Sequence, residues 1–169
     1  ALVRLGSTSE ADDYLDWLHR VLDRTSRPER LHPLYSLEGV PLAAEAVVAT
    51  LPGYAGSRPV RIGNAAQGQV QLDVFGPVAD LIHAVSQAVG RVSADDIHLL
   101  EACVDAVAAR WHEPDHGIWE IRDRPRQHVH SKVMCWMAVD RSISVLASTG
   151  AERPEWVSLR DVIAEDVLT

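Results

Sequence analysis

The chain has 169 residues, 47% of them hydrophobic and 24% charged, an ordinary composition for a soluble globular protein. No apolar run approaches the roughly 18 residues of a membrane span, so we expect no membrane partner. The formal charge of −8 would repel phosphate backbones, which argues against nucleic acid as a partner. The sequence opens on Ala1 without an initiator Met and ends within a helical pattern at Thr169, so we expect a piece of a longer chain.

A first helix is predicted at residues 9 to 24. Ser7 and Glu10 have the spacing of a capping box, and the apolar residues that follow recur at i, i+3, i+4 and i+7. The stretch from 31 to 37 then alternates and precedes the turn-prone pair Glu38-Gly39. This pattern suggests a short extended segment or a hairpin.

A long loop is predicted after Leu51, because two prolines and three glycines fall within about a dozen residues. The apolar residues beyond it repeat at helical spacing and predict a helix at residues 67 to 89. Gly76-Pro77 interrupts that pattern, and proline removes a helical hydrogen bond. We therefore expect one bent helix or two abutting helices.

Three further helices are predicted at residues 93 to 111, 131 to 147 and 154 to 168, with a second loop from 112 to 126. The fold class is all-α, because no strand alternation is strong enough for an α/β fold. Helices joined by two long loops do not fit a compact bundle. They resemble helical hairpins cut from a toroid, whose long loops gather at one end and build the site.

Glu120 is the candidate catalytic residue. It follows Trp119 directly in the second loop, between the apolar residues Ile118 and Ile121. An apolar wall favours the protonated form of a carboxyl, which can then act as an acid. The alternative is a surface carboxylate paired with Arg122 or Arg124.

The first loop carries candidate binding residues. Arg58, Arg61 and Asn64 stand among glycines, and guanidinium and amide groups are suited to holding vicinal hydroxyls. The alternative is that Asn64 caps a helix and that the arginines are surface charges.

A metal site is the weakest candidate. Four histidines lie close in sequence, but no recognisable ligand frame such as H-E-x-x-H accompanies them: His112, His116, His128 and His130. Cys103 and Cys135 each fall inside an apolar helical pattern and are expected to be small buried residues, which points to a reducing cytoplasm. We expect no metal and no other cofactor.

Four motifs in order resemble glycoside hydrolase family 15, especially its bacterial glucoamylase-like and trehalase members. They are Leu51 to Ala66, Gln71 to Gly76, Glu113 to Glu120 and His130 to Trp136. Four motifs in the right order are far more specific than any one of them, and the likeness spans almost the whole chain.

The resemblance implies that residues 1–169 are part of an (α/α)6 barrel that cleaves α-glucosidic bonds with inversion. The carbohydrate substrate would be trehalose or the non-reducing end of an α-glucan. Glu120 would be the general acid, while Arg58 and Arg61 would line the neighbouring sugar subsite, with Trp119 beside the acid. The family's general base, a second Glu, and the Arg-Asp pair that grips the terminal glucose fall outside this chain.

Two alternatives stay open on the residues alone. The chain could be a catalytically inactive helical-hairpin scaffold or interaction module, which the missing base allows, or a metal-dependent hydrolase that uses the histidines. Hairpins cut from a toroid expose apolar faces. We therefore expect either an exposed apolar patch or self-association through it.

Overall fold

The computed structural model describes residues 3–25, 27 and 30–169, which fold into five α-helices and one very short strand pair. The α-helices are α1 (Ser9–Arg24), α2 (Phe75–Val89), α3 (Ala94–Arg110), α4 (Val129–Ser148) and α5 (Pro154–Leu168). The strands are β1 (Ala46–Val47) and β2 (Arg61–Ile62). Short 3-10 turns lie at Val3–Leu5, Tyr54–Gly56, Ala65–Gly68 and Leu72–Val74. The predicted all-α class is confirmed.

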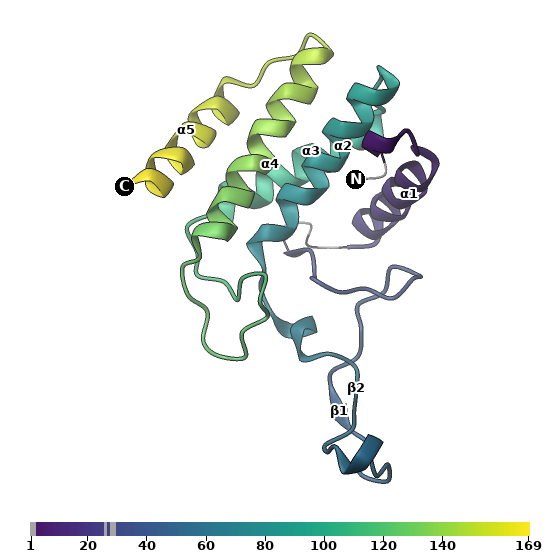
Figure 1. Ribbon diagram of the computed structural model, residues 1–169. Helices are drawn as coiled ribbons and strands as arrows, with labels where there is room; N and C mark the ends of the chain where they lie inside the picture. Colours follow the sequence, from purple (N-terminus) through teal and green to yellow (C-terminus); the bar gives the residue numbers. More distant parts are fainter. Residues whose placement is uncertain (1–2, 26, 28–29) are drawn as a thin grey trace.

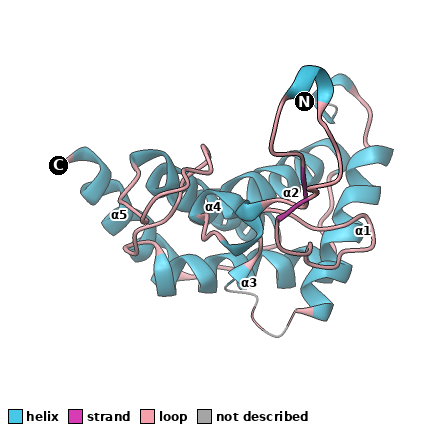
Figure 2. Ribbon diagram, turned by 90° about the horizontal axis from the view of Figure 1, so that it is seen from below, coloured by secondary structure: helices cyan, strands magenta, loops and turns pink. Residues whose placement is uncertain are grey.

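Helices α5, α4, α2 and α1 follow one another from one flank to the other, and α3 packs behind α4 and α2 (Figure 1). Tight turns at 90–93 and 149–153 connect the helices at one end. The long connections, described at 30–74 and 111–128, gather at the opposite end, which faces the viewer in Figure 2. This is the segregation of loops that the sequence predicts for the site.

Helix α4 is the centre of the packing and contacts α2, α3 and α5. Its buried face, with Cys135, Ala138 and Val139, joins a single apolar cluster with side chains of the neighbouring helices. Cys103 of α3 is buried in the same cluster, and both thiols are free. Burial raises the pKa of each thiol to about 12, so both stay protonated and pack as small apolar groups, as predicted.

Gly76 lets α2 approach α4 closely. A Cβ built on it would lie 2.7 Å from the carbonyl oxygen of Met134 and 3.0 Å from the Met134 Cβ. Alanine usually stabilises a helix relative to glycine, but here the sign should reverse because backbone must move. We expect Gly76→Ala to lower the free energy of unfolding by about 1–3 kcal/mol.

Urea unfolding of the two glycine variants checks this. Gly68→Ala is the matched control, because nothing lies within 4 Å of a Cβ built there. A Gly76→Ala midpoint at or above that of the control would show that α2 and α4 are not in backbone contact.

The predicted helix at 67 to 89 is corrected, because the α-helix begins only at Phe75. The residues before it form two separate 3-10 turns, and Gln71 between them is extended, at φ −133°. The backbone N–H of Leu72 donates to the Asp115 carboxylate, 2.9 Å away, rather than to a helical carbonyl. Pro77 thus falls in the first turn of α2, where its missing N–H costs no hydrogen bond, so the predicted kink is a helix start.

The first long connection holds two features. Near its start, Tyr35 and Pro41 form an isolated antiparallel bridge, as the alternating pattern suggested. Further on, β1 and β2 pair antiparallel, Ala46 with Ile62 and Val47 with Arg61. The hairpin that they form, residues 46–62, projects away from the helices (Figure 1).

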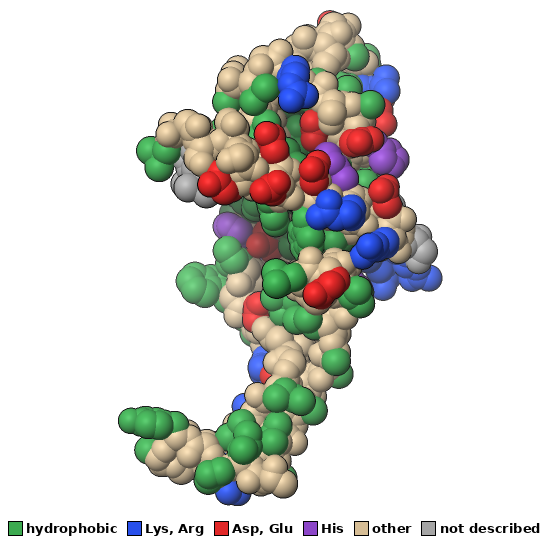
Figure 3. All heavy atoms as spheres, turned by 90° about the vertical axis from the view of Figure 1, so that its right-hand side faces the viewer, with side chains coloured by type: hydrophobic (Ala, Val, Ile, Leu, Met, Phe, Trp, Pro, Cys, Tyr) green, Lys and Arg blue, Asp and Glu red, His purple; other side chains and the backbone are tan. Residues whose placement is uncertain are grey.

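Several apolar side chains are exposed at the edges of the molecule. Figure 3 shows hydrophobic side chains gathered on the projecting hairpin, where Tyr54 is 93% exposed. On the outer flank, α5 exposes Val157, Val162 and Leu168. Such faces fit the expected patch, while self-association through them stays a prediction. No helix of the described residues is long and apolar enough to cross a membrane.

Candidate active site

Glu120 lies in the α3–α4 connection, at the end of the turn that begins at Gly117. Its backbone has φ +50°, a left-handed conformation that non-glycine residues rarely adopt. The side chain is half-buried, and its carboxylate makes no hydrogen bond or ion pair with any residue the structure describes. The alternative, pairing with Arg122 or Arg124, therefore forms no hydrogen bond or ion pair within the described chain, although the Glu120 charge, after the hydrogen bonds to Glu45, helps to raise the pKa of Arg122. A strained backbone that presents an unpaired carboxylate is a feature of functional sites.

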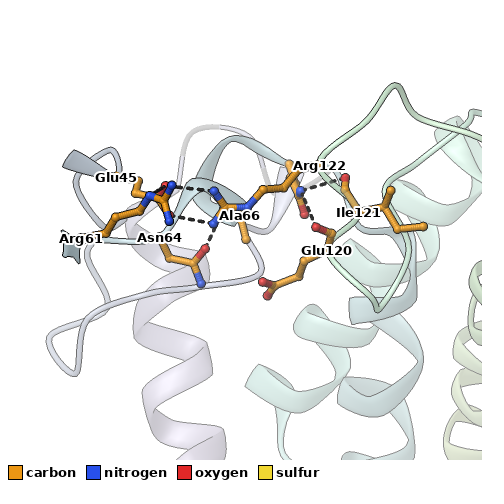
Figure 4. Close-up of polar contacts among 8 residues, drawn as sticks. Glu45, Arg61, Asn64, Ala66, Glu120, Ile121 and Arg122 are labelled. Atoms are coloured by element: carbon orange, nitrogen blue, oxygen red, sulfur yellow. Dashed lines mark hydrogen bonds and ion pairs between the residues drawn. The ribbon is translucent and has the colours of Figure 1, made fainter. Parts of the chain in front are cut away.

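Gln69 fixes the backbone around Glu120. Its side-chain Nε2 donates to the carbonyl oxygens of Glu120 and Ile121, both at 3.2 Å (Figure 4). In the same view the Glu120 side chain extends away from these contacts and takes part in none of them. The first long connection thus holds the turn by its main chain and leaves the carboxylate unengaged.

Glu45, just before β1, binds two arginines from two loops. Arg122 reaches it through a bidentate pair, Nη1 to Oε1 at 2.9 Å and Nη2 to Oε2 at 2.8 Å. Arg61 of β2 adds a contact from Nε to Oε1 at 3.1 Å (Figure 4). The hydrogen bonds from Arg122, with the charges of both arginines, hold the pKa of the Glu45 carboxyl below its usual range.

The other predicted binding residues are placed unevenly. Asn64 caps the 3-10 turn that follows it, since its Oδ1 accepts from the Ala66 N–H at 2.9 Å. Arg58 lies in the hairpin tip and donates to the Pro52 carbonyl at 3.4 Å. Trp119 is 84% exposed beside Glu120. Arg61 and Asn64 are thus brought to the Glu120 loop (Figure 4), whereas Arg58 belongs to the projecting tip.

Asp115 is buried and connects three of the four sequence motifs by hydrogen bonds. It is 1% exposed, and its Oδ2 accepts from the Leu72 N–H at 2.9 Å and from the Ser131 hydroxyl at 2.8 Å. Its own backbone bridges to Arg126, which closes the loop that carries Glu120. Asp115 therefore ties the starts of α2 and α4 to the base of the Glu120 loop.

Asp73 is a second buried carboxyl, and its Oδ1 has no hydrogen-bond partner in the described structure. Burial raises the pKa of Asp73, and the nearby carboxylate of Asp115 acts in the same direction. It faces a cavity of about 310 Å³ whose wall includes Trp17 and Tyr35. We assign it no chemical role.

The histidines are not gathered as ligands. Among the described residues, no group of three or more His, Cys, Asp or Glu side chains could hold a metal ion. His116 instead lies against Val70, with Nδ1 3.2 Å from the Val70 nitrogen, and the ring of His128 packs beneath Gly117. These contacts shape the loop around Glu120.

Sequence reasoning missed Glu45, Gln69 and Asp115. Glu45 and Arg122 are 77 residues apart, and Gln69 and Glu120 are 51 apart, so no local spacing signals either contact. Asp115 lies within one of the four motifs, and that position was a signal from which a structural role could have been predicted. Glu45 had no such signal.

Comparison with known proteins places the chain in a family. Residues 1–169 match the family described as Glycosyl hydrolases family 15. Over 99% of its own length, the chain is 36% identical to a trehalase of Thermoplasma volcanium. It is also 36% identical, over 99% of its own length, to a trehalase of Mycobacterium tuberculosis. It spans 27% and 25% of those two proteins, about a quarter of their length. No solved structure matches it significantly.

Proposed function

The chain belongs to glycosyl hydrolase family 15, and on that premise we propose that the protein containing it hydrolyses α-glucosidic bonds with inversion. The observation that carries the proposal is the unpaired carboxylate of Glu120, held in a left-handed turn at the loop end of the helices. The chain itself is proposed to be part of an (α/α)6 barrel, which the two layers of helices with an exposed α5 flank support.

Glu120 is proposed as the general acid. A protonated carboxyl donates its proton to the glycosidic oxygen as the bond breaks, so that the leaving sugar departs as an alcohol. An inverting enzyme also needs a base about 6.5–9.5 Å away, with a water molecule between them. That base is proposed to be a Glu outside this chain, which would leave the 169 residues alone inactive.

Arg61, Asn64 and Trp119 are proposed to contact the sugar next to the scissile bond. Arg61 and Asn64 lie on the segment that holds the Glu120 loop, and Trp119 offers an exposed indole face. Arg58 is included in the proposal, although it lies in the projecting tip and donates to the Pro52 carbonyl.

Trehalose is the proposed substrate, ahead of α-glucan ends, because the relatives named above are trehalases. The two free, buried cysteines fit a reducing cytoplasm, which we propose as the compartment. The net charge of −8 continues to argue against nucleic acid as a partner.

Product stereochemistry tests this proposal. Proton NMR of α,α-trehalose freshly hydrolysed by the whole protein should show one α- and one β-glucose, because only the attacked carbon inverts. Maltose in a parallel reaction ranks the substrates. Two α-glucose products, or no glucose from either sugar, would refute an inverting α-glucosidase.

A further inference from the structure

One carboxylate joins the hairpin to the Glu120 loop. Glu45 sits where the first long connection enters β1, and its two oxygens take both terminal nitrogens of Arg122 from the other connection. The side chain of Glu45 is only 17% exposed, although both arginines are about half-exposed. A bidentate pair of this kind fixes the orientation of both partners as well as their distance.

The pair differs from an ordinary surface ion pair. Isolated exposed pairs are weak, because water screens them and long side chains lose freedom when they form. Here one partly buried carboxylate is shared by two guanidinium groups, and the hydrogen bonds that Arg122 donates to Glu45 are the main reason why the pKa of Arg122 is raised. Without Glu45, Arg61 and Arg122 would both lose the carboxylate that they share.

The position of Arg122 matters because it is two residues after Glu120. The turn between them is held by hydrogen bonds at both ends. Gln69 donates to the carbonyl oxygens of Glu120 and Ile121. Arg122 donates from its side chain to Glu45. Both contacts come from residues 45–69, and they flank Glu120, whose backbone has φ +50°.

We propose that Glu45 is a positioning residue for glycoside hydrolysis, which acts by anchoring Arg122 and thereby fixing the direction of the Glu120 carboxyl. The inference rests on the proposed role of Glu120 as general acid. An acid must lie within hydrogen-bond reach of the glycosidic oxygen, and a misplacement of about 1 Å can cost about a hundredfold in rate. Loss of the anchor should therefore impair proton donation more than sugar binding.

The test uses Glu45→Gln in the whole protein with two substrates. Trehalose needs protonation of its leaving oxygen, whereas α-glucosyl fluoride releases fluoride, which needs little help from an acid. The kcat on trehalose should fall roughly ten- to a hundredfold with KM little changed, while the rate on the fluoride stays near that of the wild type. A loss caused only by poor folding would lower both rates equally.

Asp123→Asn is the matched control. Asp123 is in the same loop and also pairs with an arginine, Arg126, at 2.9 Å, but that pair does not reach the hairpin. Its rates on both substrates should match the wild type. Arg122→Gln should reproduce the Glu45→Gln pattern, and the double variant should be no worse than either single one, because both changes break one contact.

The outcomes separate this inference from the proposed function. Unchanged trehalose activity in Glu45→Gln, equal losses on both substrates in a variant with the thermal midpoint of the wild type, or additive losses in the double variant would each overturn the role of Glu45. If Glu120→Gln itself keeps full activity on trehalose, the proposed acid is wrong, and the positioning role falls with it. Should Glu45→Gln fold poorly, Arg122→Gln, which removes the exposed partner, carries the same test.

Discussion

Replacement of Glu120 by Gln in the whole protein should lower kcat on trehalose by at least about a hundredfold, with KM nearly unchanged. Glutamine keeps the shape of the side chain but has no proton to donate to the leaving oxygen. Among the described residues the carboxylate makes no hydrogen bond or ion pair, because Gln69 donates only to the main-chain carbonyls. Steady-state kinetics with the purified variant check the loss.

Stability of the Glu120→Gln variant should be that of the wild type. A thermal midpoint that falls together with activity would assign Glu120 a structural role instead. Full activity with a normal midpoint would mean that the proton comes from another group.

Asp115→Ala should give the largest loss of stability, about 2–4 kcal/mol in the free energy of unfolding. The Leu72 N–H and the Ser131 hydroxyl would both lose their acceptor in a buried place that water reaches poorly. An unsatisfied buried donor costs more than the net value of the bond it made. Urea unfolding of the 169-residue chain, with the slope of the transition compared, measures the change.

Asp105→Ala is the control for that measurement, because it removes an exposed carboxylate from α3. Its unfolding midpoint should stay close to that of the wild type. If Asp115→Ala behaved like this control, the hydrogen bonds that connect the motifs would not contribute to stability.

The helices could be predicted from sequence because their apolar stripes are local signals. The capping box expected from Ser7 and Glu10 does not form, since Thr8 is the N-cap of α1 and makes no side-chain cap hydrogen bond. A capping box is present at the start of α3, where Ser93 and Asp96 bond each other's backbone.

The start of α2 could not be predicted in the same way. Valine repeats continue through Val70 and Val74, but Leu72 gives its N–H to Asp115, 43 residues later. A tertiary contact overrode the local pattern.

The candidate site divides along the same line. The position of Glu120 in a loop after an indole was readable, and so was the option that Asn64 caps a turn. Glu45 was not readable, since an acidic residue among alanines carries no pattern until Arg122 and Arg61 are brought to it. The general base is proposed to lie outside this chain, so no reasoning from these residues could place it.

The ratio of two rates tests the central claim, that Glu120 is the general acid, most directly. Glu120→Gln in the whole protein should be nearly inactive on trehalose yet hydrolyse α-glucosyl fluoride at a rate close to that of the wild type, because fluoride departs without a proton. The ratio of fluoride to trehalose activity should therefore rise by at least about a hundredfold. An unchanged ratio, whether both rates persist or both collapse, would contradict the assignment of Glu120 as the acid.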